Sequence, residues 1–364
     1  MPASQSDRHL VLVAGTGRSG TSTLVGVLQR HGIHVPQPEV APDDSNPRGF
    51  GEPRWVVELH GRLLRQGKVQ VADSRPAAWD LAADLADADT RARVRRWLEE
   101  QFAVADRLVV KDPRILWFLP LWTEAARELG VEPSFVTMLR PPPETVGSRR
   151  TYYNRGLEDP HGIASWLNLM TGTEHATRGH RRAFVRYHDL LDDWAPVLDQ
   201  VWRRTGLGDA PPAATEDPGE FIDPGLRRMR TTWDDLELPD RLQALAAETS
   251  DCLDALATGE GDEDPAVLAR LDEARASYAA YYAEAESVAH SSVIAARHSA
   301  RSAPPRASKP KRTPAPSGTA RLWPRRRGFL ATVVDKVPAS VRRKVPAKLK
   351  QRVRRPNDRH IGGR

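Results

Sequence analysis

The stretch from His9 to Gly32 constrains the fold of this chain more than any other part of the sequence. It begins with HLVLVA, a short apolar run typical of a buried strand. A loop containing several glycines follows, and Leu24, Val25 and Leu28 then recur at helical intervals until Gly32. Such a loop presents unpaired backbone N–H groups at the positive end of the helix dipole, so we expect it to bind a phosphate or a similar anion.

The loop has the glycine spacing of a nucleotide P-loop but not its lysine. Gly15 and Gly20 are separated by four residues, with Gly17 between them. Thr21 stands where ATP- and GTP-dependent enzymes carry lysine, and the nearest fixed cation is Arg18 inside the loop. A glycine turn without a ligand is the alternative interpretation.

Further strand-like runs alternate with helical stretches along the chain. They lie at 107–110, 133–139 and 183–187. The alternation predicts an α/β fold, a three-layer P-loop-like arrangement in which helices cover both faces of a central parallel sheet. Ligands of such sheets bind beyond the carboxyl ends of the strands. Basic turns follow three of the four runs, at Arg18, Lys111 and Arg140, so we expect these cations to converge on a multiply anionic ligand.

Charge is divided unevenly along the chain. Of a total of +6, residues 301–364 carry +18, which leaves −12 on residues 1–300. The beginning of this basic tail is rich in proline and serine and is expected to be disordered. Its later part mixes valine and leucine with cations, as an interfacial helix does, so an anionic membrane surface is the expected partner. Solvated disorder is the alternative, and no specific nucleic acid is expected because no nucleic-acid-binding motif accompanies the charge.

Four segments follow from these composition changes. They are a flexible N-terminus at 1–8, an α/β core at 9–208, a helical extension at 209–298 with helices at 240–257 and 265–297, and the basic tail at 299–364. No run of eighteen apolar residues, no apolar signal core and only one cysteine occur, so a cytoplasmic protein is expected, with the tail at the inner membrane face. No metal-ligand spacing such as CxxC or HExxH appears, so no metal is expected.

Four motifs together resemble the PAPS-dependent sulfotransferases, in particular bacterial members of the superfamily that sulfates carbohydrates and other hydroxyl compounds. PAPS is 3′-phosphoadenosine 5′-phosphosulfate. The motifs are the loop AGTGRSGTST, the pair Arg140 and Ser148, the strand end VVKDPR, and FVRYHDLLDDW. The resemblance covers roughly residues 8–208 and does not cover the tail.

The resemblance implies a donor site for PAPS that needs no magnesium. Arg140 and Ser148 would bind the 3′-phosphate. The 5′-phosphosulfate would be bound by Gly15, Thr16, Gly17, Arg18, Ser19, Gly20, Thr21 and Ser22.

Catalytic roles follow from the same resemblance. Arg18 and Lys111 would stabilise the charge that develops on the departing phosphate oxygen. Lys111 is one of only two lysines in residues 1–300, the other being Lys68, in a chain that otherwise uses arginine. Glu52, in the Gly/Pro-rich stretch NPRGFGEPRWV, would take the proton of the attacking hydroxyl, with Asp112 as the alternative base.

The acceptor would be a hydroxyl compound, in particular a carbohydrate or a lipid-linked envelope precursor. The sequence predicts neither its identity nor the oligomeric state. Trp117, Trp122 and Trp166 are expected in the core rather than against a sugar ring. Two alternative functions are a P-loop kinase acting on a small molecule and a non-catalytic scaffold built on a nucleotide-binding fold.

Overall fold

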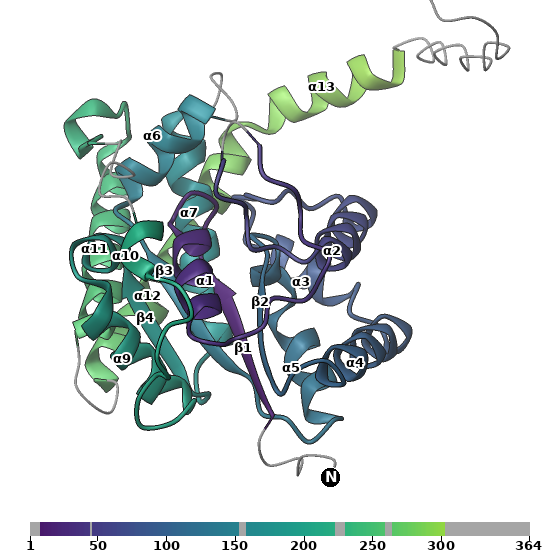
Figure 1. Cartoon of the computed structure of the whole chain (residues 1–364). Helices are drawn as coiled ribbons and strands as arrows, with labels where there is room; N and C mark the ends of the chain where they lie inside the picture. The colour runs from purple at the N-terminus through teal and green to yellow at the C-terminus, as the bar shows by residue number, and fades with distance from the viewer. Residues whose placement is uncertain (1–7, 44–45, 153–157, 223–229, 259–263, 303–364) are drawn as a thin grey trace, which may run out of the picture. The chain divides into compact units, whose positions relative to one another are not determined.

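A four-stranded, all-parallel sheet forms the centre of the molecule. The structure is a computed structural model that describes residues 8–43, 46–152, 158–222, 230–258 and 264–302 (Figure 1). The strands are β1 His9–Ala14, β2 Arg107–Lys111, β3 Ser134–Leu139 and β4 Arg182–Arg186, in the spatial order β2-β1-β3-β4. The predicted α/β class with a central parallel sheet is confirmed. The last predicted strand ends one residue early, because Tyr187 begins a helix.

Helices connect the strands and cover the sheet. Before β3 these are α1 Thr21–Arg30, α2 Arg54–Gly67, α3 Ala78–Ala83, α4 Ala88–Phe102, η2 Ile115–Phe118 and α5 Leu119–Arg127. After β3 they are α6 Pro142–Tyr152, α7 Asp159–Ala176, α8 Tyr187–Asp192, α9 Trp194–Thr205, α10 Pro218–Phe221, η4 Trp233–Asp235, α11 Asp240–Thr258, α12 Pro265–Val288 and α13 His290–Ser302. The predicted helical stretch 265–297 is therefore wrong as a single helix, because α12 and α13 separate at Ala289.

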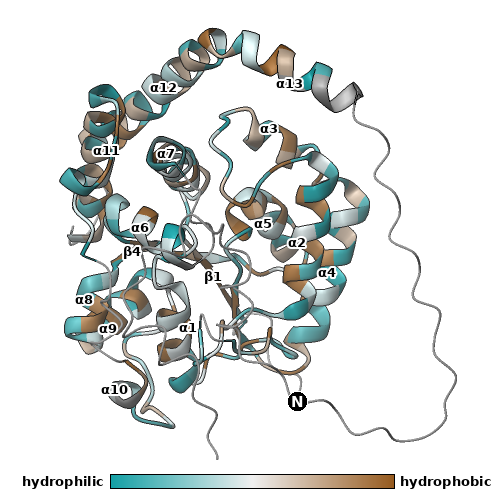
Figure 2. Cartoon of the chain, turned by 90° about the horizontal axis from the view of Figure 1, so that it is seen from above, coloured by the Kyte–Doolittle hydropathy of each residue, from teal (hydrophilic) through white to brown (hydrophobic). Residues whose placement is uncertain are grey.

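Both faces of the sheet are buried, which explains why HLVLVA is apolar at successive positions. Leu10 and Leu12 of β1 pack into a core with α2, α4 and α5. Val11 and Val13 point to the opposite face and pack with α1, α8 and α9. Figure 2 shows the two groups of helices on either side of β1. The sheet and its two helical coverings make three layers, and the carboxyl ends of all four strands meet at one edge.

The C-terminal helices α11 and α12 pack beside β4 and α7. Phe184 of β4 and Trp166 of α7 lie in one buried cluster with Leu253 of α11 and Tyr278 of α12. Tyr278 donates a hydrogen bond to the carbonyl of Ser74, so α12 is also tied to the loop before α3.

The described residues up to 298 form one compact unit, which ends within α13. The predicted flexible N-terminus and basic tail lie outside the described residues, except for residue 8 and residues 299–302. Their disorder, the membrane partner of the tail, and the division of 9–298 into core and extension stay predictions. Over the described ranges, no helix combines the length and the apolar character of a membrane span.

Candidate active site

The loop between β1 and α1 has a backbone that only glycine adopts readily at two of its positions. Gly15 and Gly20 have φ angles of 143° and 93°. A Cβ atom on Gly20 would lie 2.1 Å from Cδ2 of Tyr187, so this position also has no room for a side chain. Arg18 has a φ of 78°, a strained conformation for a residue with a side chain that is typical of functional sites.

The first turn of α1 opens toward this loop. Thr21 and Ser22 are its first two residues, and the N–H groups at such positions have no partner inside a helix. No acidic side chain occupies this turn, so the positive end of the helix dipole is not neutralised by the helix itself. The sequence prediction of an anion-binding loop therefore has the local geometry that it requires.

Arg18, Arg140 and Ser148 are brought together at this loop. Arg18 Nε donates a hydrogen bond of 3.1 Å to Ser148 Oγ of α6. Arg140, which follows β3, donates from Nη1 to the backbone carbonyl of Arg18 over 3.0 Å. The guanidinium of Arg140 also lies over the ring of Tyr187, 4.8 Å from its centre. Three residues from separate parts of the chain thus form one cationic, hydroxyl-bearing cluster.

Glu144 holds Arg140 and His188 contacts Glu144 in turn; sequence reasoning missed both residues. Glu144 Oε2 accepts a hydrogen bond of 3.0 Å from Arg140 Nε and makes a second contact of 3.1 Å with His188 Nε2. Burial raises the pKa of Glu144, but the hydrogen bonds from His188 and Arg140 outweigh burial and leave its pKa below the ordinary value. The i,i+4 spacing of Arg140 and Glu144 was the available sequence signal.

Several buried polar atoms around this cluster lack a partner within the described part of the chain. They include Arg140 Nη2, Ser19 Oγ and Thr145 Oγ1. The three residues are 7%, 1% and 0% exposed. An unpaired buried polar atom costs roughly 1–3 kcal/mol and is uncommon in folded proteins. A bound anion would supply acceptors for the guanidinium and the hydroxyls, so the site fits a phosphate-bearing ligand.

The other predicted loop residues lie in the same turn. The carbonyl of Thr16, which is buried, accepts a hydrogen bond from the N–H of Ser19 over 3.1 Å. Gly17 faces open space, since a Cβ added there would meet no atom within 4 Å. The residues from Gly15 to Ser22 thus lead directly from the end of β1 into the first turn of α1, with no other element between them.

A second cluster lies at the end of β2, the strand that pairs with β1 on one side of the sheet. Lys111 Nζ forms an ion pair of 2.7 Å with Glu52 Oε1 and donates to Ser22 Oγ over 3.1 Å. It also donates to the carbonyl of Phe50 over 3.1 Å, which ties the loop before α2 to the strand. Lys111 is 3% exposed and Glu52 is 7% exposed. Because Ser22 belongs to the first turn of α1, the lysine and the glutamate border the anion-binding loop.

The environment of Glu52 makes it a better proton acceptor than an ordinary glutamate. Burial raises its pKa, and the charge of Asp112 adds to this effect. The ion pair with Lys111 lowers the pKa but only in part, so the pKa of Glu52 stays above that of an ordinary glutamate. A carboxylate with a raised pKa binds a proton more strongly, as a general base requires.

Asp112, the alternative base, has both carboxylate oxygens engaged. Arg114 Nη1 donates to Oδ1 over 2.6 Å, and the ring of His60 contacts Oδ2 at 2.7 Å. Trp122 Nε1 donates to His60 Nε2 over 2.9 Å, so the proton of the neutral ring lies on Nδ1 and is donated to Asp112. Burial raises the pKa of Asp112, but the hydrogen bonds from His60 and Arg114 outweigh it and lower the pKa. Asp112 is therefore an ionised residue that fixes the turn after Lys111.

We expect Asp112→Asn to destabilise the protein by about 3–5 kcal/mol, because one donor of a buried charged cluster loses its acceptor. Urea unfolding measures this change. Asp106→Asn, at an exposed carboxylate just before β2, is the matched control and should change stability by less than about 0.5 kcal/mol. If the two variants were equally stable, the contacts of Asp112 with His60 and Arg114 would not support the fold.

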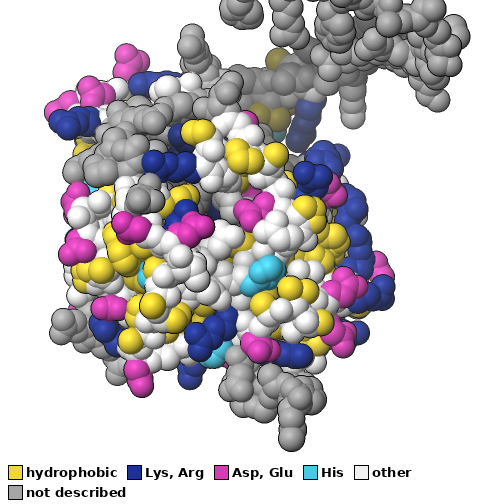
Figure 3. All heavy atoms as spheres, viewed as in Figure 1, with side chains coloured by type: hydrophobic (Ala, Val, Ile, Leu, Met, Phe, Trp, Pro, Cys, Tyr) yellow, Lys and Arg dark blue, Asp and Glu magenta, His cyan; other side chains and the backbone are white. Residues whose placement is uncertain are grey.

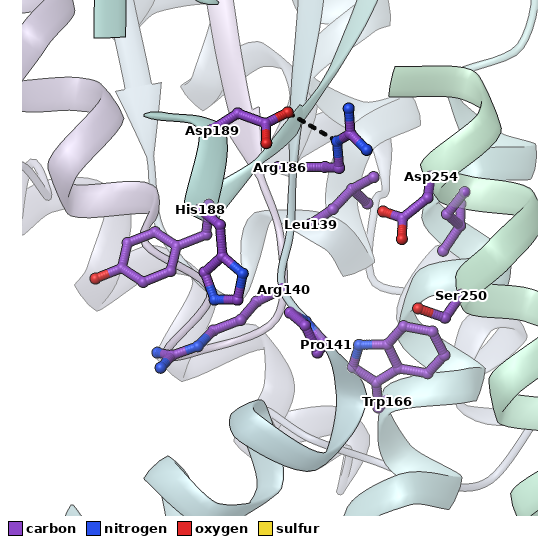
Figure 4. Close-up of a pocket in the computed structure, with 11 residues that line it drawn as sticks. Leu139, Arg140, Pro141, Trp166, Arg186, His188, Asp189, Ser250 and Asp254 are labelled. Carbon is purple, nitrogen blue, oxygen red and sulfur yellow. Dashed lines mark hydrogen bonds and ion pairs between the residues drawn. The ribbon is translucent and has the colours of Figure 1, made fainter. Parts of the chain in front are cut away.

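A cavity of about 250 Å³ lies beside Arg140 (Figure 4). Arg140 and His188 line one side, and Trp166 and Ser250 lie opposite. Asp254 of α11 also faces it, and burial raises the pKa of this carboxyl group. A ligand held by Arg140 therefore has space next to it for a further group.

The predicted core tryptophans Trp117, Trp122 and Trp166 are confirmed as buried, each at most 2% exposed. Among the residues that the structure describes, no group of three His, Cys, Asp or Glu side chains is placed to hold a metal ion.

Comparisons with known proteins find similarity in structure and not in sequence. No protein-family model matches the chain, and no curated protein matches it in sequence. A sulfotransferase domain of an olefin synthase from Synechococcus matches with a TM-score of 0.40 and 15% identity, over 67% of this chain and 94% of that one. A sulfotransferase from Mycobacterium tuberculosis matches with a TM-score of 0.39 and 16% identity, over 70% of this chain and 77% of that one. A sulfotransferase domain from the curacin biosynthetic pathway matches with a TM-score of 0.37 and 18% identity, over 67% of this chain and 98% of that one.

Proposed function

We propose that this protein is a sulfotransferase that transfers a sulfuryl group from PAPS to a hydroxyl group of an acceptor. The observation that supports this best is the set of buried, unpartnered atoms Arg140 Nη2 and Ser19 Oγ beside the Arg18–Ser148 contact. Arg140 follows β3 and Ser19 follows β1, whereas the ion pair of Lys111 and Glu52 lies at the end of β2, on the other side of β1. A donor with two separated anionic groups needs two such places, one for anchoring and one for reaction.

In this proposal the anchoring residues hold the 3′-phosphate. Arg140 is fixed by Glu144 and by the Arg18 carbonyl, which leaves its Nη2 to donate to the ligand. Ser148 Oγ and Arg18 lie in hydrogen-bond contact beside it. The backbone N–H groups between Gly15 and Ser22 hold the 5′-phosphosulfate.

The reacting residues are Lys111, Glu52 and Arg18. PAPS supplies an activated sulfuryl group, and its transfer leaves negative charge on the phosphate oxygen. Lys111 and Arg18 stabilise that charge. Glu52 takes the proton of the acceptor hydroxyl, and the adjacent ammonium of Lys111 keeps the carboxylate ionised until then. We propose a carbohydrate or an envelope precursor as the acceptor, in line with the sequence resemblance.

Ligand-dependent thermal stabilisation tests the proposal against its alternatives. Without magnesium, adenosine 3′,5′-bisphosphate should raise the melting temperature, whereas adenosine 5′-monophosphate should raise it much less. A ligand at one hundred times its Kd stabilises the folded state by about 2.7 kcal/mol. Stabilisation by ATP or GTP with magnesium in place of the bisphosphate would indicate a P-loop kinase. Stabilisation by none of them would indicate a scaffold.

A further inference from the structure

A cationic groove runs along α2. It has a volume of about 600 Å³ and lies between α2, the residues 69–71 that follow it, and the turn after β2. Its charged lining consists of Arg62, Arg65, Arg114 and Glu58. Val57 and the exposed Val71 add apolar surface. We call this surface the α2 groove.

The arginines that line the α2 groove lie close together on the surface. Within the described ranges, Arg62 and Arg65 form no ion pair, although both are exposed. Arg91 and Arg127, by contrast, are each paired with a glutamate at 2.7 Å. Figure 3 shows Lys and Arg side chains, with acidic ones among them, along the right-hand edge of the molecule, where α2 and α4 lie in Figure 1. Glu58 offsets part of this charge, but three arginines gather in one groove of a region whose net charge is −12, as expected of a surface that binds an anionic ligand.

Arg114 connects the α2 groove with the reacting residues. Its guanidinium lines the groove and binds Asp112, the residue that follows Lys111. Its charge also lowers the pKa of Glu52, which places it within electrostatic reach of that carboxylate. The helix itself starts at Arg54, two residues after Glu52. The groove therefore extends away from the reacting pair along one helix.

The groove lies on the side of the reacting pair that an acceptor must occupy. The proposed 3′-phosphate residues follow β3, whereas Lys111 ends β2, and β1 separates these strands in the sheet. In an in-line displacement the attacking hydroxyl enters opposite the leaving group. With the nucleotide on the β3 side, the acceptor approaches from the β2 side, where α2 and Arg114 lie.

From this arrangement we infer that the α2 groove binds the acceptor, and that the acceptor is an elongated acidic molecule such as an acidic oligosaccharide. The inference rests on the proposed sulfotransferase function. Arg62 and Arg65 lie eight and eleven residues after the start of α2, roughly 12 and 16 Å along its axis. An acidic group bound there belongs to the same molecule as the hydroxyl that reacts near Glu52, so the acceptor spans this distance.

Tetragalacturonic acid and its methyl ester are a matched pair of probes, since they differ only in charge. We expect the acid to protect Arg62 and Arg65 of the full-length protein from modification by phenylglyoxal, read by mass spectrometry. The methyl ester should not protect them, and neither compound should protect Arg96 of α4, which is exposed outside the groove. The double variant R62Q/R65Q should bind the acid about tenfold more weakly, whereas R96Q should bind it as the wild type does.

Equal protection by the acid and the ester, or no protection by the acid, would overturn the inference. Stabilisation by adenosine 3′,5′-bisphosphate is measured on the same samples and reports only on the donor site. If the protein bound the bisphosphate but not the acid, the proposed function would stand and the acidic acceptor would be ruled out. If it bound the acid but not the bisphosphate, the groove would still bind acids, but the proposed function and the acceptor role of the groove would both be ruled out.

Discussion

Glu52→Gln is expected to lower kcat for sulfuryl transfer about 10²–10⁴-fold, the usual contribution of a positioned general base. The amide has the shape of the carboxylate and still accepts a hydrogen bond from Lys111, but it cannot take the acceptor's proton. Affinity for adenosine 3′,5′-bisphosphate should not change, because Glu52 contacts Lys111 rather than Arg140 or Ser148. Release of the bisphosphate from PAPS in the presence of acceptor measures the rate.

Two controls accompany this variant. Glu100→Gln, at an exposed glutamate of α4, should leave the rate unchanged. The pH profile of kcat provides the second, because only the ionised form of Glu52 accepts a proton. Since burial raises the pKa of Glu52, activity should rise with pH over a range that lies above the titration range of an ordinary glutamate. If Glu52→Gln kept the wild-type rate and acid limb, Glu52 would not be the base.

Arg140→Gln is expected to weaken binding of adenosine 3′,5′-bisphosphate about 30- to 3,000-fold. Loss of one partner from a buried, hydrogen-bonded charge pair costs about 2–5 kcal/mol, and each 1.4 kcal/mol corresponds to a factor of ten. Arg140 is buried, and Glu144 and the Arg18 carbonyl fix its orientation before a ligand arrives, so a shorter neutral side chain does not replace it. Calorimetric titration measures the Kd.

Adenosine 5′-monophosphate serves as the matched ligand for this variant. It lacks the 3′-phosphate, so its affinity should be nearly the same for the wild type and for Arg140→Gln. Arg127→Gln, at a surface arginine paired with Glu132, should bind both nucleotides normally. An equal loss of affinity for both nucleotides would show that Arg140 supports the fold of the site and does not recognise the 3′-phosphate.

Local sequence patterns were sufficient to predict the sheet and the anion-binding loop. Successive apolar residues, as from Leu10 to Ala14, mark a sheet buried on both faces, and Gly15 and Gly20 mark positive φ angles. Apolar runs and glycine positions are local features, so they can be read from a single sequence without knowing which distant residues are in contact. The break between α12 and α13 was missed because residues around Ala289 carry no proline or glycine to mark it.

Contacts between residues far apart in the chain could not be predicted. His188 follows Glu144 by 44 residues, and Asp112 follows His60 by 52, yet each pair is in contact. Such pairs depend on which helix packs against which strand. The resemblance to a family supplied Glu52, whose ion pair with Lys111 joins residues 59 positions apart. Choosing between Glu52 and Asp112 required the hydrogen bonds of both carboxylates.

A crystal structure with adenosine 3′,5′-bisphosphate would show directly whether the loop after β1 and the residues after β3 bind the donor nucleotide. We expect the 3′-phosphate within hydrogen-bond distance of Arg140 Nη2 and Ser148 Oγ. We expect the 5′-phosphate on the N–H groups between Gly15 and Ser22, facing Lys111. A nucleotide bound elsewhere, or one whose 3′-phosphate contacts neither Arg140 nor Ser148, would contradict the proposal that this protein is a PAPS-dependent sulfotransferase.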